Sequence, residues 1–572
     1  MNTTIQLSGA HALIHSIIHE GTDTIFGYPG GNIIPVFDAL YDYYNQIHYV
    51  LGRHEQGSIH AAQGYARISG KVGVCIVTSG PAATNVITGI GDAMLDSTPL
   101  VVITGQVGDT MLGTDAFQEI DMVGITQPIT KWCYQIRRPE EIAWAVARAF
   151  YIARTGRKGP VVLDFTKNAQ NALVTDYRPE KCTFIRSYVP VSKPNMAKIE
   201  EAAQLINQAK KPLALVGQGV LLGNAEVELT QFLEKADIPA GWTLLGESAL
   251  PSDFRLNKGM LGMHGNIAPN LKTNECDVLI AIGMRFDDRV TGDMNTYAKQ
   301  AKIIHFDIDV AEIGKNIPVD VPVLGDVKTT LPLITQLLKK TSHQEWVNSF
   351  AVAERKEKEL VIEKEIHPKE GAIKMGEVIA KIADATHNQA VVVTDVGQNQ
   401  MMAARYSKFA QSNSFITSGG LGTMGFGIPA AIGAKIGAPE RTVVLFVGDG
   451  GFQMTIQELG TIMQEKVGVK MVILNNNFLG MVRQWQELFY HKRYSSTPMQ
   501  NPDFVAIAKA YGINAAVVGE REKLDNAIEA MLSDDKAYLL VVNVEDNGLV
   551  YPMTPAGTCV TNIIVNGEKI VL

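Results

Sequence analysis

The chain has 572 residues, which is too many for one hydrophobic core, so two to four domains are expected. Apolar residues make up 46% and charged residues 19% of the chain, an ordinary balance for a globular enzyme. The formal net charge of −8 argues against a nucleic-acid partner, and no apolar run is long enough for a membrane span. The five widely spaced cysteines form no CxxC pair, and the N-terminus lacks the pattern of a signal peptide, so we expect a cytoplasmic protein.

Short β-branched runs alternate with helical patterns along the chain, as in proteins with buried parallel strands. Residues 176–195 (rich in Pro, Lys and Arg) and 342–371 (strongly charged) interrupt this rhythm, and we interpret the charged stretch as a solvated helix or linker. The breaks predict an α/β protein with three doubly wound, mainly parallel domains, at residues 1–185, 195–345 and 370–555. Examples of runs predicted as strands are Val72–Thr78, Leu100–Thr104, Pro160–Phe165, Pro212–Val216, Val278–Ile282, Ile303–Phe306, Val391–Thr394, Val443–Val447 and Met471–Leu474.

A candidate metal and diphosphate motif follows two of these runs. The strand Val443–Val447 leads into Gly448-Asp449-Gly450-Gly451, and Met471–Leu474 leads into Asn475-Asn476-Asn477. The intervening length leaves room for one helix and a return strand, so both turns could reach the same edge of a parallel sheet. Asp449 and Asn476 could then share a Mg²⁺ with a diphosphate. Either piece alone favours an ordinary turn or loop, but the two together favour a cofactor site.

Glu55 is a candidate acid–base group. The segment from His54 to Ala66 is predicted as a helix, in which Glu55 shares one apolar face with Ile59, Ala62 and Ala66. A carboxyl group on a buried face needs a partner or a raised pKa. The pattern alone leaves a satisfied structural glutamate equally open.

Together these segments resemble the thiamine-diphosphate enzymes, in which a glutamate beside N1′ of the aminopyrimidine helps the cofactor lose its C2 proton. Arg53-His54-Glu55-Gln56 matches that family sequence. Longer motifs, spread from Ser8 to about Gly557, make the chain similar to the acetohydroxyacid synthase (acetolactate synthase) family. They are Phe26–Gly31, Gly113–Glu119, Met260–Gly265, Arg285–Gly292 and Gly480–Gln486.

The resemblance implies three domains in the architecture of thiamine-diphosphate enzymes. The first would bind the pyrimidine through Glu55, and the third would bind the diphosphate and Mg²⁺ through Asp449, Asn476 and the backbone carbonyl of Phe478. Met424 is similar to the residue that bends the cofactor. The remaining residues implied in binding thiamine diphosphate are Gly397, Gln398, Asn399, Gly422, Gly450, Gly451, Gly480 and Met481.

The same resemblance implies that pyruvate is decarboxylated and its two-carbon unit is joined to a second pyruvate or to 2-ketobutyrate, for branched-chain amino acid synthesis. Arg289 matches the arginine that holds the carboxylate of the second substrate, a role suited to a bidentate fork. Trp485 is expected to contact the alkyl group of that substrate, with a core tryptophan as the alternative. The other residues implied at the substrate site are Gly31, Phe117, Gln118, Lys167, Met263 and Met481.

The central domain is expected to bind FAD, which this family retains without a redox step in the main reaction. Gly217-Gln218-Gly219 follows a predicted strand but is an incomplete nucleotide-binding motif. Asp307 follows another strand and could accept hydrogen bonds from a ribose. The FAD residues implied by the resemblance are Arg157, Gly217, Gly219, Thr243, Leu244, Met263, His264, Gly283, Arg285, Asp287, Arg289, Asp307, Ile308 and Asp326.

Four positions depart from the family pattern. Asn32 stands where Ala is usual, Ala82 replaces a Gly, Asn399 replaces a His, and Gly451 replaces a common Ser. The last two would remove possible contacts to the diphosphate.

Other functions were weighed against this one. A related thiamine lyase or oxidase, such as pyruvate oxidase, would not need Arg289 and Trp485, and glyoxylate carboligase lacks the carboxylate at Glu55. A non-catalytic flavin- or nucleotide-binding protein is disfavoured by Asp449 and Asn476. The resemblance also implies a homodimer or homotetramer, since the family's site lies between subunits, and a small regulatory subunit as partner.

Overall fold

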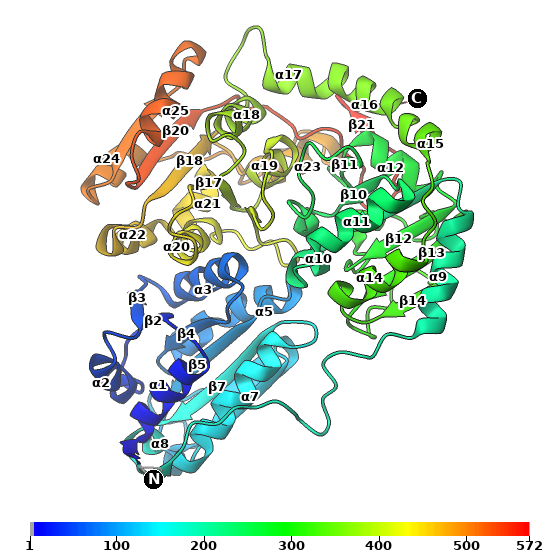
Figure 1. Ribbon diagram of the computed structural model, residues 1–572. Helices are drawn as coiled ribbons and strands as arrows, with labels where there is room; N and C mark the ends of the chain where they lie inside the picture. Colours follow the sequence, from blue (N-terminus) through cyan, green and yellow to red (C-terminus); the bar gives the residue numbers. More distant parts are fainter. Residues whose placement is uncertain (1–4, 571–572) are drawn as a thin grey trace.

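Three six-stranded parallel sheets organise the computed structural model, which describes residues 5–570 (Figure 1). Helices cover both faces of each sheet, because each sheet contributes to two separate hydrophobic clusters, one on either side. The predicted fold class, α/β with three doubly wound domains, is confirmed. In residues 5–570 no helix combines the length and the apolar character that crossing a membrane requires.

The first sheet has the strand order β3-β2-β4-β5-β7-β6. Its strands are β2 (Thr24–Tyr28), β3 (His48–Leu51), β4 (Gly73–Val77), β5 (Leu100–Gln106), β6 (Trp132–Ile136) and β7 (Pro160–Thr166). Its helices are α1 (Gly9–His19), α2 (Ile34–Asp42), α3 (Glu55–Ser69), α4 (Pro81–Asn85), α5 (Ile87–Leu95), α6 (Met122–Thr126), α7 (Ile142–Arg154) and α8 (Lys167–Asn171), and β1 (Ile5–Ser8) pairs antiparallel with β8 (Leu173–Tyr177).

The second sheet has the order β11-β10-β9-β12-β13-β14, the arrangement of dinucleotide-binding sheets. Its strands are β9 (Pro212–Val216), β10 (Ala240–Trp242), β11 (Asn257–Met260), β12 (Val278–Ile282), β13 (Lys302–Asp307) and β14 (Val321–Leu324). Its helices are α9 (Met196–Gln208), α10 (Gln218–Leu222), α11 (Glu226–Ala236), α12 (Ile267–Thr273), α13 (Asp288–Thr291), α14 (Val327–Leu337), α15 (Gln344–Asn348) and α16 (Ala351–Glu357).

The third sheet, β16-β15-β17-β18-β20-β19, repeats the topology of the first when the strands of each are numbered along the chain. Its strands are β15 (Val391–Thr394), β16 (Phe415–Ile416), β17 (Val443–Gly448), β18 (Val469–Asn475), β19 (Asn514–Val518) and β20 (Tyr538–Asn543). Its helices are α17 (Glu363–Ile366), α18 (Met375–Ala385), α19 (Gln398–Tyr406), α20 (Gly427–Gly437), α21 (Asp449–Met454), α22 (Leu459–Glu465), α23 (Gly480–Phe489), α24 (Phe504–Ala510) and α25 (Leu524–Leu532), and β21 (Ile564–Val565) pairs antiparallel with β22 (Glu568–Lys569).

Helices α3 and α20 bring the first and third sheets together (Figure 1). Two glycines make their close crossing possible. A Cβ on Gly64 would lie 2.0 Å from the carbonyl oxygen of Ala430, and a Cβ on Gly433 would lie 1.8 Å from that of Ala61. Any larger residue at either glycine would force these two helices apart.

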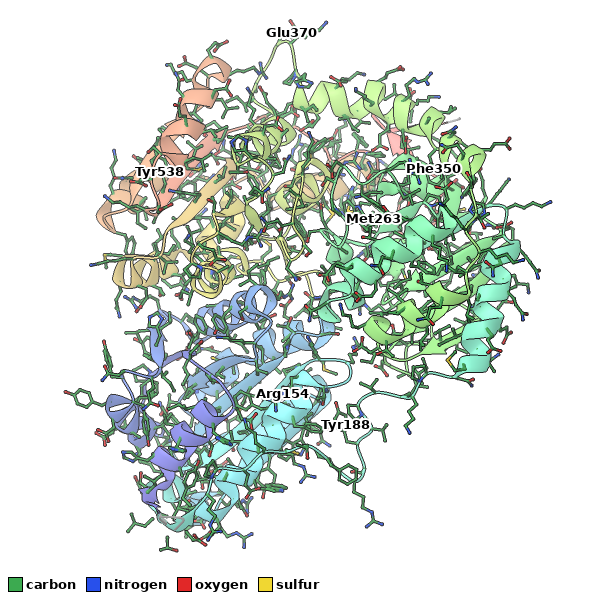
Figure 2. The ribbon with its side chains drawn as sticks, viewed as in Figure 1. Arg154, Tyr188, Met263, Phe350, Glu370 and Tyr538 are labelled. Atoms are coloured by element: carbon green, nitrogen blue, oxygen red, sulfur yellow. The ribbon has the colours of Figure 1, made fainter. Side chains whose placement is uncertain are left out.

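The two stretches that interrupt the strand rhythm connect the domains. Residues 176–195 cross from the first sheet to the second, with Tyr188 holding the connection by donating a hydrogen bond to the carbonyl oxygen of Thr155 at 2.7 Å (Figure 2). The charged stretch 342–371 is largely helical, as expected. It is not simply solvated, however, because Glu357 is only 2% exposed and pairs with Arg405 of the third domain. That buried ion pair corrects the sequence interpretation.

Candidate active site

Each of the three sheets has a point where the strand order reverses, and such points are where ligands bind in open α/β sheets. In the first sheet this point lies between the carboxyl ends of β2 and β4, beside Gly31. In the central sheet it lies between β9 and β12, beside Gly217 and Gly283. In the third sheet it lies between β15 and β17, beside Gly397 and Asp449. The predicted site residues therefore lie at the points where the strand order reverses.

The proposed metal ligands lie close together at the edge of the third sheet, because β17 and β18 are parallel neighbours that end in register. Asp449 is 1% exposed and accepts a hydrogen bond from Nδ2 of Asn501 at 2.7 Å. Asn476 is buried, and its Oδ1 accepts a hydrogen bond from the backbone N–H of Phe478 at 3.2 Å. Burial raises the pKa of Asp449. A divalent cation would offset that cost, so the residues fit Mg²⁺.

The backbone around Gly397 leaves open space for a diphosphate. Gly397 has φ +131° and lies at the N-terminus of α19, where helix N–H groups favour an anion. Gly422 has φ +69°, and a Cβ on it would lie 3.8 Å from the side chain of Val396, an ordinary van der Waals contact. Asn399 keeps a polar atom there, since its Oδ1 would lie 3.4 Å from a Cβ on Gly397 and 3.7 Å from a Cβ on Gly448.

Asp395, which the sequence analysis did not single out, fixes the loop that carries Met424. Its carboxylate accepts hydrogen bonds from the backbone N–H groups of Gly425 at 3.0 Å and Gly427 at 2.9 Å. It also explains Gly451, where a Cβ would lie 2.4 Å from an Asp395 oxygen. A serine at residue 451 would require the carboxylate of Asp395 to shift. The sequence pattern that could have indicated Asp395 is the Asp395-Val396-Gly397 turn, which directly follows a strand.

Glu55 is the first residue of α3, and the stripe below it is buried as predicted, at Ile59, Ala62 and Ala66. Glu55 itself is half-buried, and its Oε2 accepts a hydrogen bond from Nδ2 of Asn85 at 2.9 Å. The carboxylate thus has a partner and remains accessible from outside the domain.

The other predicted residues of the first domain gather at the edge of their own sheet. Nζ of Lys167 donates to the carbonyl oxygen of Gly31 at 2.7 Å. Gln118 has φ +61° and packs against Gly80, whose built Cβ lies 2.9 Å from Cα of Gln118. Phe117 beside it is 86% exposed, which is unusual for a phenylalanine in a folded chain.

The departure at Asn32 has a structural role at this edge. Its Nδ2 donates to Oγ of Ser79 at 2.7 Å, and its backbone N–H donates to Oγ1 of Thr78 at 3.2 Å. These bonds tie the turn after β2 to the turn after β4.

A cavity of about 820 Å³ lies where the three domains meet. Met263, one of its lining residues, is on the side of the central domain that faces the third domain (Figure 2). All of the predicted FAD residues except Gly217 line this cavity, together with Gly397, Gly422, Met481 and Trp485. Gly217 instead lets the chain pass close to Gly283, since a Cβ on it would lie 2.2 Å from the carbonyl oxygen of Gly283. Glu55, Gly31, Phe117, Gln118 and Lys167 do not line the cavity.

Arg157 and His264 show two kinds of polar environment in the cavity. Nη1 of Arg157 donates to Oε1 of Glu312 at 2.6 Å and lies 3.4 Å from Asp309. His264 is buried. Burial and the neighbouring Arg405 lower its pKa to about 4, so His264 is a neutral ring at pH 7. The cavity therefore offers a mixed polar and apolar lining.

Comparisons with known proteins agree with this architecture. Residues 7–125, 199–334 and 395–542 match, in order, the N-terminal TPP binding, central, and C-terminal TPP binding domain families of thiamine pyrophosphate enzymes. The chain is 44% identical to acetolactate synthase isozyme 2 large subunit of Escherichia coli (strain K12), over 96% of this chain and 98% of that protein. It is 43% identical to acetolactate synthase large subunit of Lactococcus lactis, over 96% and 95%. On the evidence of its three domains and of these full-length relatives, the chain belongs to the acetolactate synthase large-subunit family of thiamine pyrophosphate enzymes.

Proposed function

We propose that this chain is an acetolactate synthase that decarboxylates pyruvate and joins the two-carbon unit to a second pyruvate or to 2-ketobutyrate. One observation carries the proposal. Arg289 and Trp485 line the same cavity as Gly397 and Gly422 of the proposed diphosphate loops. An arginine and an indole beside the cofactor suit a second substrate that has a carboxylate and a short alkyl chain.

We propose that each chain carries two half-sites and that a complete site requires two copies, as a homodimer or homotetramer. Glu55 and Lys167 lie outside the cavity that holds Arg289 and Trp485, which supports this arrangement. The exposure of Phe117 supports it further, because an exposed aromatic side chain at a site edge suits burial by a second subunit.

The roles of the residues follow from their chemistry. When bound, thiamine diphosphate supplies a cationic ring that accepts the electron pair released as CO₂ leaves. Glu55 would hold a proton at N1′ of the pyrimidine. Asp449, Asn476 and the carbonyl oxygen of Phe478 would bind Mg²⁺. Arg289 would hold the carboxylate of the second substrate, and Trp485 would pack on its alkyl group.

We also propose that FAD binds in the large cavity. The strand order of the central sheet supports a dinucleotide there, as does the lining by Asp307, the last residue of β13, and by Asp326, which follows β14. The purified protein should show flavin absorption, and denaturation should release FAD unmodified. A protein that binds thiamine diphosphate with full activity but takes up no flavin would refute this part alone.

A small regulatory subunit is proposed as partner because the relatives are named large subunits. The five unpaired cysteines support a reducing cytoplasm as the location. The domain bounds 1–185, 195–345 and 370–555 are kept as proposals for truncation experiments.

The function is tested by supplying pyruvate to the purified chain with Mg²⁺ and thiamine diphosphate. Acetolactate should form only when both are present, and 2-ketobutyrate should divert the product to acetohydroxybutyrate. Acetaldehyde or acetate as the sole product would instead indicate a decarboxylase or an oxidase.

A further inference from the structure

The loop 417–424 belongs to both proposed cofactor sites. Ser418 to Gly422 line the large cavity, and Met424, proposed to bend thiamine diphosphate, lies two residues after Gly422. Any group that fixes this loop therefore acts on two cofactors at once.

Two buried carboxyl groups of the first domain, Asp92 of α5 and Asp96 at the C-cap of that helix, hold this loop of the third domain. Asp96 accepts hydrogen bonds from the backbone N–H groups of Gly419 at 2.9 Å and Gly420 at 2.7 Å, one on each oxygen. Asp92 accepts from the hydroxyl groups of Ser418 and of Thr423, the latter at 3.2 Å. Both side chains are 0% exposed, so these hydrogen bonds face no competition from water.

Arg67 of α3 completes the cluster. Its Nη2 donates to Asp96 at 2.7 Å, its Nη1 donates to the carbonyl oxygen of Thr417, and its Cζ lies 5.5 Å from the ring centroid of Phe426. Arg67 thus contacts the first residue of the loop and Phe426 just beyond its end, and it supplies the cation for Asp96.

The backbone at the centre of the loop, at Gly420, is closely packed. A Cβ on Gly420 would lie 2.8 Å from Oδ1 of Asp96 and 3.2 Å from Nη2 of Arg285, which lines the cavity. The backbone of Gly420 therefore lies between the carboxyl group of Asp96 in the first domain and the guanidinium group of Arg285 in the central domain. All three domains meet at this residue.

We infer that Arg67, Asp92 and Asp96 are positioning residues for both cofactors, setting the shared loop 417–424 from the first domain of the same chain. This inference rests on the proposed function. It assigns the first domain a role in the cavity of its own chain, distinct from the role of Glu55. Loss of the cluster should weaken thiamine diphosphate and FAD together.

The test compares Asp96→Asn with a matched control, Asp237→Asn. Asp237 also pairs with an arginine, Arg255 at 2.6 Å, and accepts from a backbone N–H, that of His343 at 2.7 Å, but has no contact with the loop. Thiamine diphosphate binding is measured by calorimetry with saturating Mg²⁺, and FAD binding by quenching of flavin fluorescence, on the full-length chain. Asparagine keeps one acceptor but loses at least one charge-assisted bond, so both affinities should fall by about tenfold or more in Asp96→Asn. The control should bind both cofactors as the wild type does.

Ser418→Ala provides a second variant that acts from the loop side, in case Asp96→Asn does not fold. It should weaken both cofactors in the same direction, and the concentration of thiamine diphosphate needed for half-maximal activity should rise by the same factor. Wild-type affinity for both cofactors in folded Asp96→Asn or in Ser418→Ala would overturn the inference. If the wild type itself bound no thiamine diphosphate, the proposed function would fail instead.

Discussion

Arg405 and Glu357 form an ion pair between the third and central domains that is almost fully removed from water. Nη2 of Arg405 lies 2.6 Å from Oε1 of Glu357, and the two side chains are 1% and 2% exposed. Glu357 also accepts from Nδ2 of Asn266 at 3.0 Å and from the backbone N–H of Ile267 at 2.7 Å. Arg405→Met keeps the volume of the side chain but leaves the carboxylate buried without its cation.

The expected cost follows from that burial. Breaking a buried pair by removing one partner typically costs about 3–5 kcal/mol, because the remaining charge is uncompensated. The two remaining hydrogen bonds on Glu357 place the estimate at the lower end, about 3 kcal/mol. The matched control is Lys198→Met, which breaks an exposed pair with Glu201 and should cost less than about 1 kcal/mol.

The assay is urea unfolding followed by far-UV circular dichroism, on both single variants and on Arg405→Met combined with Glu357→Gln. Because glutamine is neutral, the double variant should recover part of the lost stability. The reasoning is refuted if Arg405→Met loses no more than the Lys198→Met control, or if Glu357→Gln restores nothing in the Arg405→Met background.

Four further predictions concern single side chains. We expect the wild type to prefer 2-ketobutyrate over pyruvate by on the order of tenfold, since one buried methylene is worth about 1–3 kcal/mol in a shaped pocket. Trp485→Leu should lose most of this preference. An unchanged product ratio in a competition assay would show that Trp485 has only a structural role. Glu55→Gln should fold but slow C2–H exchange of bound thiamine diphosphate, followed by NMR in D₂O, and exchange at the wild-type rate would exclude Glu55 as the activator. Asp449→Ala should weaken Mg²⁺ and thiamine diphosphate together in calorimetry, because the charge of the diphosphate is then unbalanced, and normal affinity would contradict the metal site. Burial lowers the pKa of His60 to about 3, below its unfolded value of about 6.5, so the fold excludes a proton that the unfolded chain accepts. Wild type should therefore lose stability relative to His60→Asn as pH falls from about 6.5 towards 3, by up to ~1.4 kcal/mol per pH unit, and a difference independent of pH would show that His60 is not buried as a neutral ring.

Several inner strands could be predicted because both of their faces are buried. Val391–Thr394, Pro212–Val216 and Val278–Ile282 appear with the predicted bounds. Edge strands were missed for the opposite reason. In β19, for example, Asn514 and Val517 are exposed, so its sequence does not form a continuous apolar run.

The candidate site was predicted as separate motifs, and only the family resemblance implied that it is divided between subunits. Asp449 and Asn476 could be paired because each follows a buried strand of one sheet. Nothing local in the sequence indicates that Glu55 lies outside the cavity that contains Arg289, since that depends on how whole domains pack.

Partners that are distant in sequence were missed for a related reason. Glu357 is hidden within a charged run, and only the fold brings Arg405 to it. Asn501 bonds to Asp449 from a segment with no motif. Hydrogen bonds of this kind are fixed by tertiary packing, so sequence periodicity gives no signal for them.

The central claim is tested most directly by the stoichiometry of the reaction with pyruvate as the only substrate. Pyruvate consumption, CO₂ release and acetolactate formation are measured together on the purified chain with Mg²⁺ and thiamine diphosphate. A carboligase consumes two molecules of pyruvate for each CO₂ released and each acetolactate formed, and that is the predicted result. One pyruvate consumed per CO₂, without acetolactate, would contradict the account.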